Sequence, residues 1–335
     1  MRRAARIALT FVMLSCGGGH AVRELNASRT AAFPEPWPAD KPTDSASAST
    51  APSASSSHAA NSGPPTAPAA GVFVSATPQL AAYALVIGIE RYRDAPAATG
   101  ARADAERFAS VARKTLGIRQ DRIILSVDER ATKSDIEGHL AWLESNVTAG
   151  SRIYLFYSGH GAPEIAGGAP YLFPYDANPK SVTTSGIPLS AVMTTLARTK
   201  AKDVLVFLDS CFSGGGGRSV LPPGARPLMR VKMSAAAPQV QVALFTASGA
   251  DEIAGPALGG GLGLFSKYVT DGIGTAAADT DGDGQISLQE LADWVKPRVM
   301  RDAKTDSRDQ TPTLTVGSGV GGAQNFSVAW GLPSK

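Results

Sequence analysis

The sequence has few of the residues that would suggest several common classes of protein. It contains two cysteines and four histidines, and its formal net charge is only +3. Because the basic residues are scattered rather than clustered, a nucleic-acid-binding surface is not expected. Hydrophobic residues nevertheless make up 43% of the 335 residues, which is enough to bury a substantial core.

The first sixteen residues predict export. Three arginines precede an apolar run at residues 7–14, which is too short to cross a bilayer and is typical of a secretory signal. The ending "MLSCGGG" resembles the bacterial lipoprotein signal, which implies lipidation of Cys16 and a membrane anchor facing the periplasm or the cell surface. A plain signal peptide cleaved nearby is the alternative. With Cys16 lipidated, Cys211 is the only remaining thiol and no intramolecular disulfide can form.

Residues 17–78 form a region of biased composition in which Ser, Ala, Pro and Thr dominate. Such a segment buries too little apolar surface to offset the loss of chain entropy on folding, so we predict a flexible tether. A single domain is then expected over residues 79–335.

Short apolar runs alternate with amphipathic segments in this domain. The pattern predicts strands at residues 83–89, 122–127, 152–158, 203–209 and 241–248, and helices at residues 104–116, 134–145, 189–199 and 263–273. Alternation of this kind favours an α/β fold with a mainly parallel sheet covered by helices on both faces.

Two predicted strands end at residues that carry chemistry. His160 follows the strand 152–158 and Cys211 follows the strand 203–209, and ligands gather at the carboxyl ends of strands in open α/β sheets. A thiolate nucleophile with an imidazole base is the arrangement of a cysteine hydrolase, and the amides of Gly161 and Cys211 would suit an oxyanion. The other histidines lie in the tether (His20, His58) or in a predicted helix (His139). A satisfied histidine and an inert buried cysteine are the alternative.

The sequences "YSGHG" and, fifty-one residues later, "LDSCFSG" resemble the caspase-like cysteine peptidases, in particular their metacaspase and bacterial branch. The segments "ALVIGI", "ARADAERF", "TASGADEIAG", "GLFSKYV" and "QTP" extend the resemblance over about residues 83–312. It implies a three-layer sandwich around a six-stranded caspase-type sheet, a protein or peptide substrate, His160 as general base, Cys211 as nucleophile, and no cofactor for the Cys–His chemistry.

The resemblance also implies a primary specificity pocket lined by Asp104, Ser158 and Asp209. The helix start "GARADA" keeps Asp104 but lacks the cysteine and asparagine that are usual in metacaspases. Two carboxylates in one pocket favour a guanidinium or an ammonium group, so we expect cleavage after Arg or Lys. Alternatively, Asp104 is a charge favoured by the helix dipole and Asp209 is a turn residue at a strand end.

The stretch "DTDGDGQISLQE", residues 279–290, matches the twelve-residue calcium loop of an EF-hand. Gly284 occupies the sharp turn, and the predicted ligands are Asp279, Asp281, Asp283, Gln285 (through its carbonyl), Ser287 and Glu290. We therefore expect Ca²⁺ to bind, with weak rather than sensor-type affinity. An Asp/Gly-rich surface turn is the alternative.

The loop at residues 213–233 contains four basic residues among Gly and Pro. We hypothesise that the enzyme cuts itself there, although a solvated loop without such a role is equally compatible with the composition.

Together these features predict a lipid-anchored, caspase-like cysteine endopeptidase. The alternatives are a catalytically silent caspase-like module that binds a peptide or partner, and a Cys–His acyltransferase on another α/β scaffold, in which Asp104 and Asp209 would have no evident purpose. The sequence indicates no oligomeric state.

Overall fold

The computed structural model describes residues 73–163, 170–212, 241–249, 252–317 and 322–333. Its main sheet has six strands in the order β10-β8-β7-β3-β1-β2. All neighbouring strands are parallel except the pair β10 and β8. The strands are β1 (Ala82–Gly88), β2 (Ile123–Val127), β3 (Arg152–Ser158), β7 (Asp203–Asp209), β8 (Gln241–Thr246) and β10 (Thr313–Val316).

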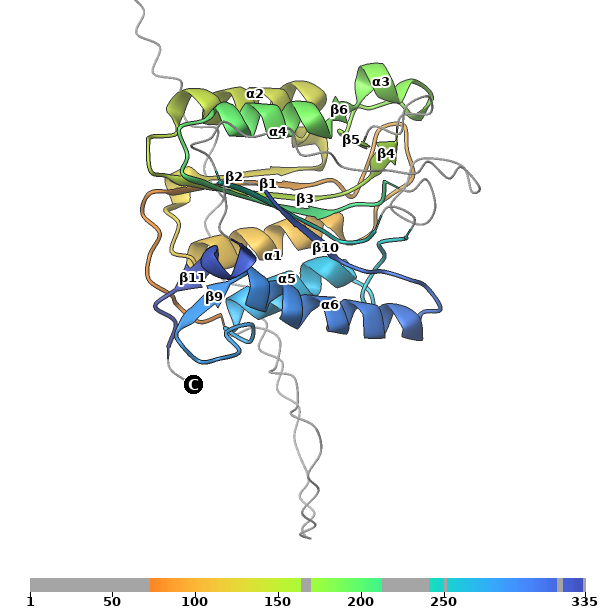
Figure 1. Ribbon diagram of the computed structural model, residues 1–335. Helices are drawn as coiled ribbons and strands as arrows, with labels where there is room; N and C mark the ends of the chain where they lie inside the picture. Colours follow the sequence, from red (N-terminus) through yellow and green to blue (C-terminus); the bar gives the residue numbers. More distant parts are fainter. Residues whose placement is uncertain (1–72, 164–169, 213–240, 250–251, 318–321, 334–335) are drawn as a thin grey trace, which may run out of the picture. The chain divides into compact units, whose positions relative to one another are not determined.

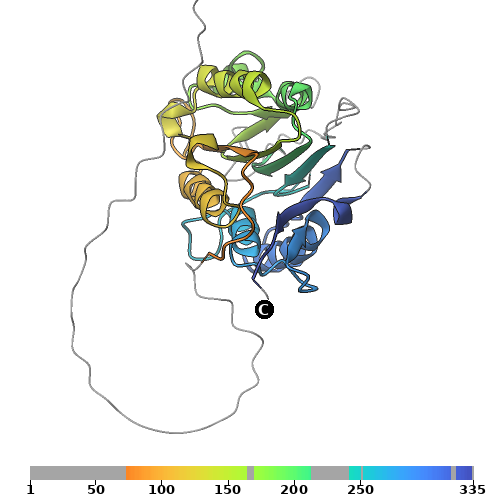
Figure 2. The same cartoon turned by 90° about the vertical axis from the view of Figure 1, so that its left-hand side faces the viewer.

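Helices cover both faces of this sheet, so the predicted three-layer fold is confirmed (Figure 1; Figure 2). One face carries α2 (Lys133–Asn146) and α4 (Leu189–Arg198). The other face carries α1 (Ala101–Lys114), α5 (Leu264–Gly274) and α6 (Leu288–Thr305).

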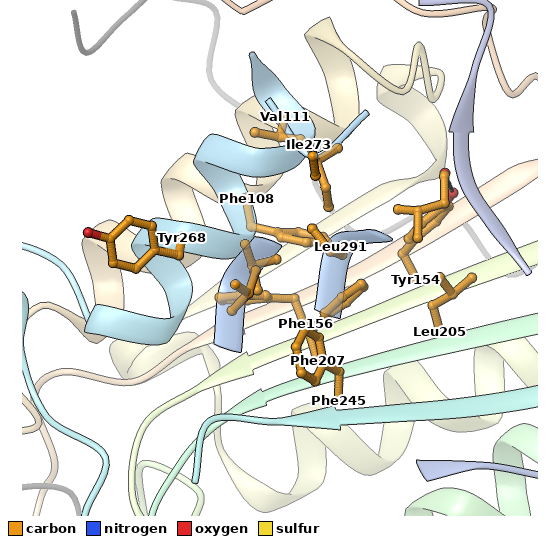
Figure 3. Packing of buried hydrophobic residues seen from close by; sticks show 14 of the residues in the cluster. Phe108, Val111, Tyr154, Phe156, Leu205, Phe207, Phe245, Tyr268, Ile273 and Leu291 are labelled. Atoms are coloured by element: carbon orange, nitrogen blue, oxygen red, sulfur yellow. Dashed lines mark hydrogen bonds between the residues drawn. The ribbon is translucent and has the colours of Figure 1, made fainter. Parts of the chain in front are cut away.

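The alternation of side chains along each strand divides the core into two clusters. Tyr154 and Phe156 of β3 pack with α1, α5 and α6, whereas Ile153 and Leu155 pack with α2 and α4. Figure 3 shows the first cluster, in which the rings of Phe108 and Phe156 stack with centroids 4.5 Å apart. Strands buried on both faces read as continuous apolar runs, which is why the sequence located β1, β3 and β7 within one residue.

Smaller elements, too short for a sequence period, were not predicted. A three-stranded antiparallel sheet contains β4 (Gly161–Pro163), β5 (Pro170–Leu172) and β6 (Ile187–Pro188), and β9 (Gln285–Ser287) pairs with β11 (Ser327–Trp330). The remaining elements are α3 (Val182–Ser185) and four 3₁₀ turns, η1 (Gln120–Arg122), η2 (Asp128–Arg130), η3 (Pro179–Ser181) and η4 (Ala323–Asn325).

The segment before β1 lies against the domain. The amides of Val74, Ala76 and Thr77 donate hydrogen bonds to the carbonyls of Gly274, Thr115 and Trp330, so residues 73–78 of the predicted tether are bound to the folded part. We call residues 73–79 the N-terminal strap.

Several predictions concern residues outside the described ranges. The signal segment 1–16 with Cys16, most of the tether 17–78, and the proposed self-cleavage loop 213–233 are among them. Within the described residues, no helix is both long and apolar enough to cross a membrane.

Candidate active site

The turns that carry His160 and Cys211 leave the sheet side by side. Strands β3 and β7 pair in parallel up to Ser158 and Asp209, and His160 and Cys211 each stand two residues beyond that last pair. A Cβ atom at Gly161 would lie 2.7 Å from the carbonyl oxygen of Cys211, which no side chain tolerates. Glycine is therefore required at position 161, and the histidine turn packs directly on the cysteine turn.

The imidazole of His160 is held by the loop between β1 and α1. Its Nε2 lies 2.7 Å from the carbonyl oxygen of Pro96, and its ring packs on Tyr92 with centroids 4.7 Å apart. The backbone amide of His160 donates to the Tyr92 hydroxyl at 2.6 Å. Because a carbonyl only accepts, Nε2 carries the proton of the neutral ring and Nδ1 is the basic nitrogen.

Sequence reasoning missed both Pro96 and Tyr92. Pro96 acts through its backbone carbonyl, which no side-chain pattern encodes. Tyr92 belongs to a polar loop, "YRDAPAATG", without periodicity. The long-range contact to His160 is set by the fold rather than by any local signal.

The thiol of Cys211 is fully buried, with 0% of the residue exposed. Its Sγ accepts a hydrogen bond from the Ala254 amide at 2.8 Å and donates one to the Ala254 carbonyl at 3.2 Å. The segment around Ala254 is itself held, because the Gly255 amide donates to the Gln310 side chain and Arg308 donates to the carbonyl of Pro256. The backbone of Ala254 thus contacts the sulfur through both its amide and its carbonyl, and the thiol is shielded from solvent.

The structure brings Asp104, Ser158 and Asp209 into one buried polar cluster, each with 0% exposure. The Ser158 hydroxyl donates to Asp104 Oδ2 at 2.7 Å, and Ser158 is the register partner of Asp209. Helix α1 reaches the sheet closely enough for this contact because Gly88 of β1 has no side chain. A Cβ there would lie 2.5 Å from the Ala101 carbonyl.

Both acids also hold the start of α5. Asp104 accepts the Gly263 amide at 2.7 Å, and Asp209 accepts the Ser266 amide at 3.0 Å and its hydroxyl at 2.7 Å. Gly263, the N-cap residue, has no side chain to cap the helix, so Asp209 supplies the acceptor that the first turn lacks. These contacts agree with the structural alternatives for Asp104 and Asp209 as well as with a role in a pocket.

The predicted calcium loop connects α5 to α6. Carboxylate oxygens of Asp279, Asp281 and Asp283 come within 4.8 Å of one another, a spacing suited to one hard cation. Asp279 is buried whereas Asp281 and Asp283 are exposed. The strand β9, inside the loop, pairs with β11, so its backbone partner is a strand from the end of the described domain.

The last residues of the loop also form the start of α6. Ser287 caps the helix, and Glu290 accepts the Ser287 and Thr280 amides at 2.9 and 3.0 Å. Burial tends to raise the pKa of Glu290, but these hydrogen bonds outweigh it and hold the pKa below its usual value. Gln285 is exposed beside them. The residues present therefore fit a calcium ion chemically. Glu290 takes part in the cap of α6 and also occupies the position of a calcium ligand.

Comparison with known proteins identifies the fold and the family. A family model described as a caspase domain matches residues 81–318. A solved structure from Geobacter sulfurreducens is similar, with 18% identity and a TM-score of 0.51, covering 70% of this chain and 93% of that one. At this identity the likeness shows the fold alone. No curated protein matches the chain.

Two insect structures are also similar. Caspase-1 of Spodoptera frugiperda has 13% identity and a TM-score of 0.44, and covers 73% of this chain and 90% of that one. The Drosophila initiator caspase Dronc has 12% identity and a TM-score of 0.46, and covers 77% of this chain and 85% of that one.

Proposed function

Because the chain belongs to the caspase-domain family, whose model matches residues 81–318, we propose that it is a cysteine endopeptidase that cleaves peptide bonds after arginine or lysine. The observation that carries the proposal is the packing of the His160 turn on the Cys211 turn, through Gly161. Two isolated residues from distant parts of the sequence thereby stand at one edge of the sheet.

The proposed chemistry follows from the orientation of His160. Its Nε2 proton is bound by the Pro96 carbonyl, so Nδ1 takes the proton from the Cys211 thiol and the sulfur attacks the scissile carbonyl carbon. The amides of Gly161 and Cys211 bind the oxyanion. Collapse of this intermediate breaks the C–N bond as the imidazolium gives its proton to the leaving amine, and water then hydrolyses the thioester.

The preference for a basic residue is proposed from the buried acids. Asp104 and Asp209 are both anchored at the start of α5, beside the proposed nucleophile. A guanidinium that displaced the donors of Gly263 and Ser266 would offer both carboxylates charged hydrogen bonds in exchange for neutral ones.

Calcium binding at residues 279–290 is part of the proposal. It is supported by the clustered oxygens of Asp279, Asp281 and Asp283 and by the low pKa of Glu290. The expected affinity is in the range of extracellular modules, about 10⁻⁴ to 10⁻³ M. The proposal also includes lipidation of Cys16 and self-cleavage within residues 213–233.

One observation favours a second candidate. Cys211 is fully buried, and its Sγ is hydrogen-bonded to both the amide and the carbonyl of Ala254. A cysteine in this state is expected in a catalytically silent module that binds a peptide or partner through another surface.

Hydrolysis of fluorogenic peptides ending in Arg, Lys or Asp separates the two candidates. The full chain is compared with Cys211→Ala, and Cys16→Ser serves as the matched control because it removes the other cysteine. We expect Arg and Lys peptides to be cleaved by wild type and Cys16→Ser but not by Cys211→Ala. Cleavage of the Asp peptide alone would overturn the specificity, and no turnover by wild type with or without Ca²⁺ would favour the silent module.

The same proteins test self-cleavage. After incubation with Ca²⁺, wild type is expected to yield two fragments cut within residues 213–233, whereas Cys211→Ala stays intact. Identical uncut bands from both proteins would reject self-cleavage without bearing on the peptide assay.

A further inference from the structure

The loop that holds His160 has its own anchor. Tyr92 and Pro96, which contact the backbone and the ring of His160, both lie between β1 and α1. The Ala98 amide donates to the Glu90 carbonyl at 2.9 Å and closes the base of this loop. We call residues 90–98 the histidine loop.

A buried carboxylate binds the base of the histidine loop. Asp128, just past the end of β2, is 0% exposed, and its Oδ1 accepts the amides of Glu90 and Arg91, each at 3.0 Å. Its Oδ2 accepts the Arg91 side chain at 3.2 Å and the Arg102 side chain of α1 at 3.2 Å. One carboxylate therefore ties the loop to β2 and to the start of α1.

The conformation and charge of Asp128 fit this role. Its φ of 47° lies in the left-handed region, which aspartate and asparagine adopt more readily than most residues. Burial tends to raise the pKa of Asp128, but the Arg91 and Glu90 amides and the two guanidinium groups outweigh it and hold the pKa below its usual value. The group is thus a carboxylate throughout the neutral range.

We propose that Asp128 is a positioning residue for the Cys–His chemistry: by fixing the histidine loop at Glu90 and Arg91, it holds the Pro96 carbonyl against Nε2 of His160. This inference rests on the proposed function. The ring keeps Nδ1 as its basic nitrogen only while Pro96 stays in place. Asp128 touches neither substrate nor His160, so its effect is transmitted through the loop.

Asp128→Asn tests the charge without changing the shape. Asparagine accepts the same φ and keeps Oδ1 for the two amides, but it turns an N–H₂ group toward Arg91 and Arg102. We expect kcat on an Arg peptide to fall about 10- to 100-fold with KM changed less than twofold. Asp121→Asn is the matched control, because Asp121 pairs with Arg119 at an exposed site in η1, and it should leave both constants unchanged.

A spectroscopic measurement separates positioning from general damage. In the full chain labelled with ¹⁵N-histidine, His160 is identified by the signals that disappear in His160→Ala. At a pH where the ring is neutral, wild type should show a single tautomer protonated at Nε2, and Asp128→Asn should show averaged tautomers. A folded Asp128→Asn with wild-type ring signals and kcat within twofold of wild type would overturn the proposal.

The ring signals also distinguish failure of this proposal from failure of the proposed function. If wild type cleaves no peptide, the endopeptidase proposal fails, and the tautomer of His160 still decides whether Asp128 positions it.

If Asp128→Asn does not fold, Arg91→Met replaces it. The Arg91 side chain is 62% exposed, so the substitution leaves packing intact and removes only part of the anchor. We expect kcat to fall about threefold with some mixing of tautomers, and unchanged kcat and signals would count against the proposal.

Discussion

Strand β7 carries two aspartates toward the same layer of helices, and the surroundings of the two differ. Arg152 and Asp203 form the first pair in the register of β3 with β7, and Ser158 and Asp209 form the last. At the amino end, the Arg152 guanidinium donates to Asp203 at 2.7 Å. At the carboxyl end, the register partner is a small hydroxyl residue, and Asp209 accepts hydrogen bonds from Ser266 of α5.

The same strand pairing places one aspartate in an ion pair within the chain and the other at the start of α5, where we propose that it binds a substrate cation. The side chains of Arg152 and Asp203 are 13% and 10% exposed, and the guanidinium contacts the faces of the Phe326 and Trp330 rings, 5.5 and 5.1 Å from their centroids. That ion pair is complete within the chain. At the other end, the proposed function requires a substrate guanidinium to displace the Ser266 donors that bind Asp209.

Two matched substitutions in β7 give the largest expected difference between its two ends. Asp209→Asn should lower kcat/KM for an Arg peptide by about 100- to 1,000-fold, because a buried carboxylate contact to a cation is lost. Asp203→Asn removes the same charge from the same face of the same strand, and it should leave kcat/KM within about threefold. Equal losses in both variants, measured on proteins with intact thermal transitions, would contradict the contrast.

At the amino-terminal ends of β3 and β7, substitutions should affect stability more than activity. Arg152→Leu leaves Asp203 buried without its cation, and we expect the free energy of unfolding to fall by about 3 kcal/mol. The double variant with Asp203→Leu should recover much of this loss, because apolar partners need no mutual neutralisation. Urea unfolding measures both, and a double variant no more stable than Arg152→Leu would show that the ion pair is not the cause.

Asp128 is another buried aspartate, and it differs from Asp203 and Asp209 in having two guanidinium partners, Arg91 and Arg102. Its pKa lies below the usual value of 3.8, so its stabilisation is present above about pH 4 and is lost as pH falls through the folded-state pKa. At neutral pH the free energy of unfolding of wild type should be about 2 kcal/mol higher than that of Asp128→Asn. This difference in free energy should become smaller only in strong acid. A difference that becomes smaller between pH 7 and pH 5 would disagree with this assignment.

The predicted calcium loop lies next to the amino-terminal ends of β3 and β7. Gln285 of β9, which belongs to the loop, lines the same groove of about 240 Å³ as Arg152 and Trp330. Ca²⁺ at ten times its Kd should raise the free energy of unfolding by about 1.4 kcal/mol. Asp281→Asn should abolish the increase. Asp293→Asn, an exposed acid on α6 outside the loop, is the matched control, and the same increase in all three proteins would mean that calcium acts elsewhere.

The sequence predicted the layers of the fold because buried parallel strands and amphipathic helices have strong periods. The ends of neighbouring parallel strands meet, which is why the sequence also indicated that His160 and Cys211 lie close together. The cluster of Asp104, Ser158 and Asp209 was expected only from the family resemblance. The sequence did not predict the histidine loop or Asp128, because backbone carbonyls and amides carry no sequence signature. The burial of Cys211 by Ala254 was equally hidden, as it depends on a contact between residues 43 positions apart.

The N-terminal strap has a mechanical consequence. A pulling force on the chain ahead of Phe73 would be borne by four amide-to-carbonyl bonds, which lead to the carbonyls of Gly274, Thr115, Trp330 and Leu116. These acceptors lie at or just beyond the C-terminal ends of α5, α1 and β11. Tension would therefore act at the amino-terminal edge of the parallel strands, opposite the edge at which the turns of His160 and Cys211 lie.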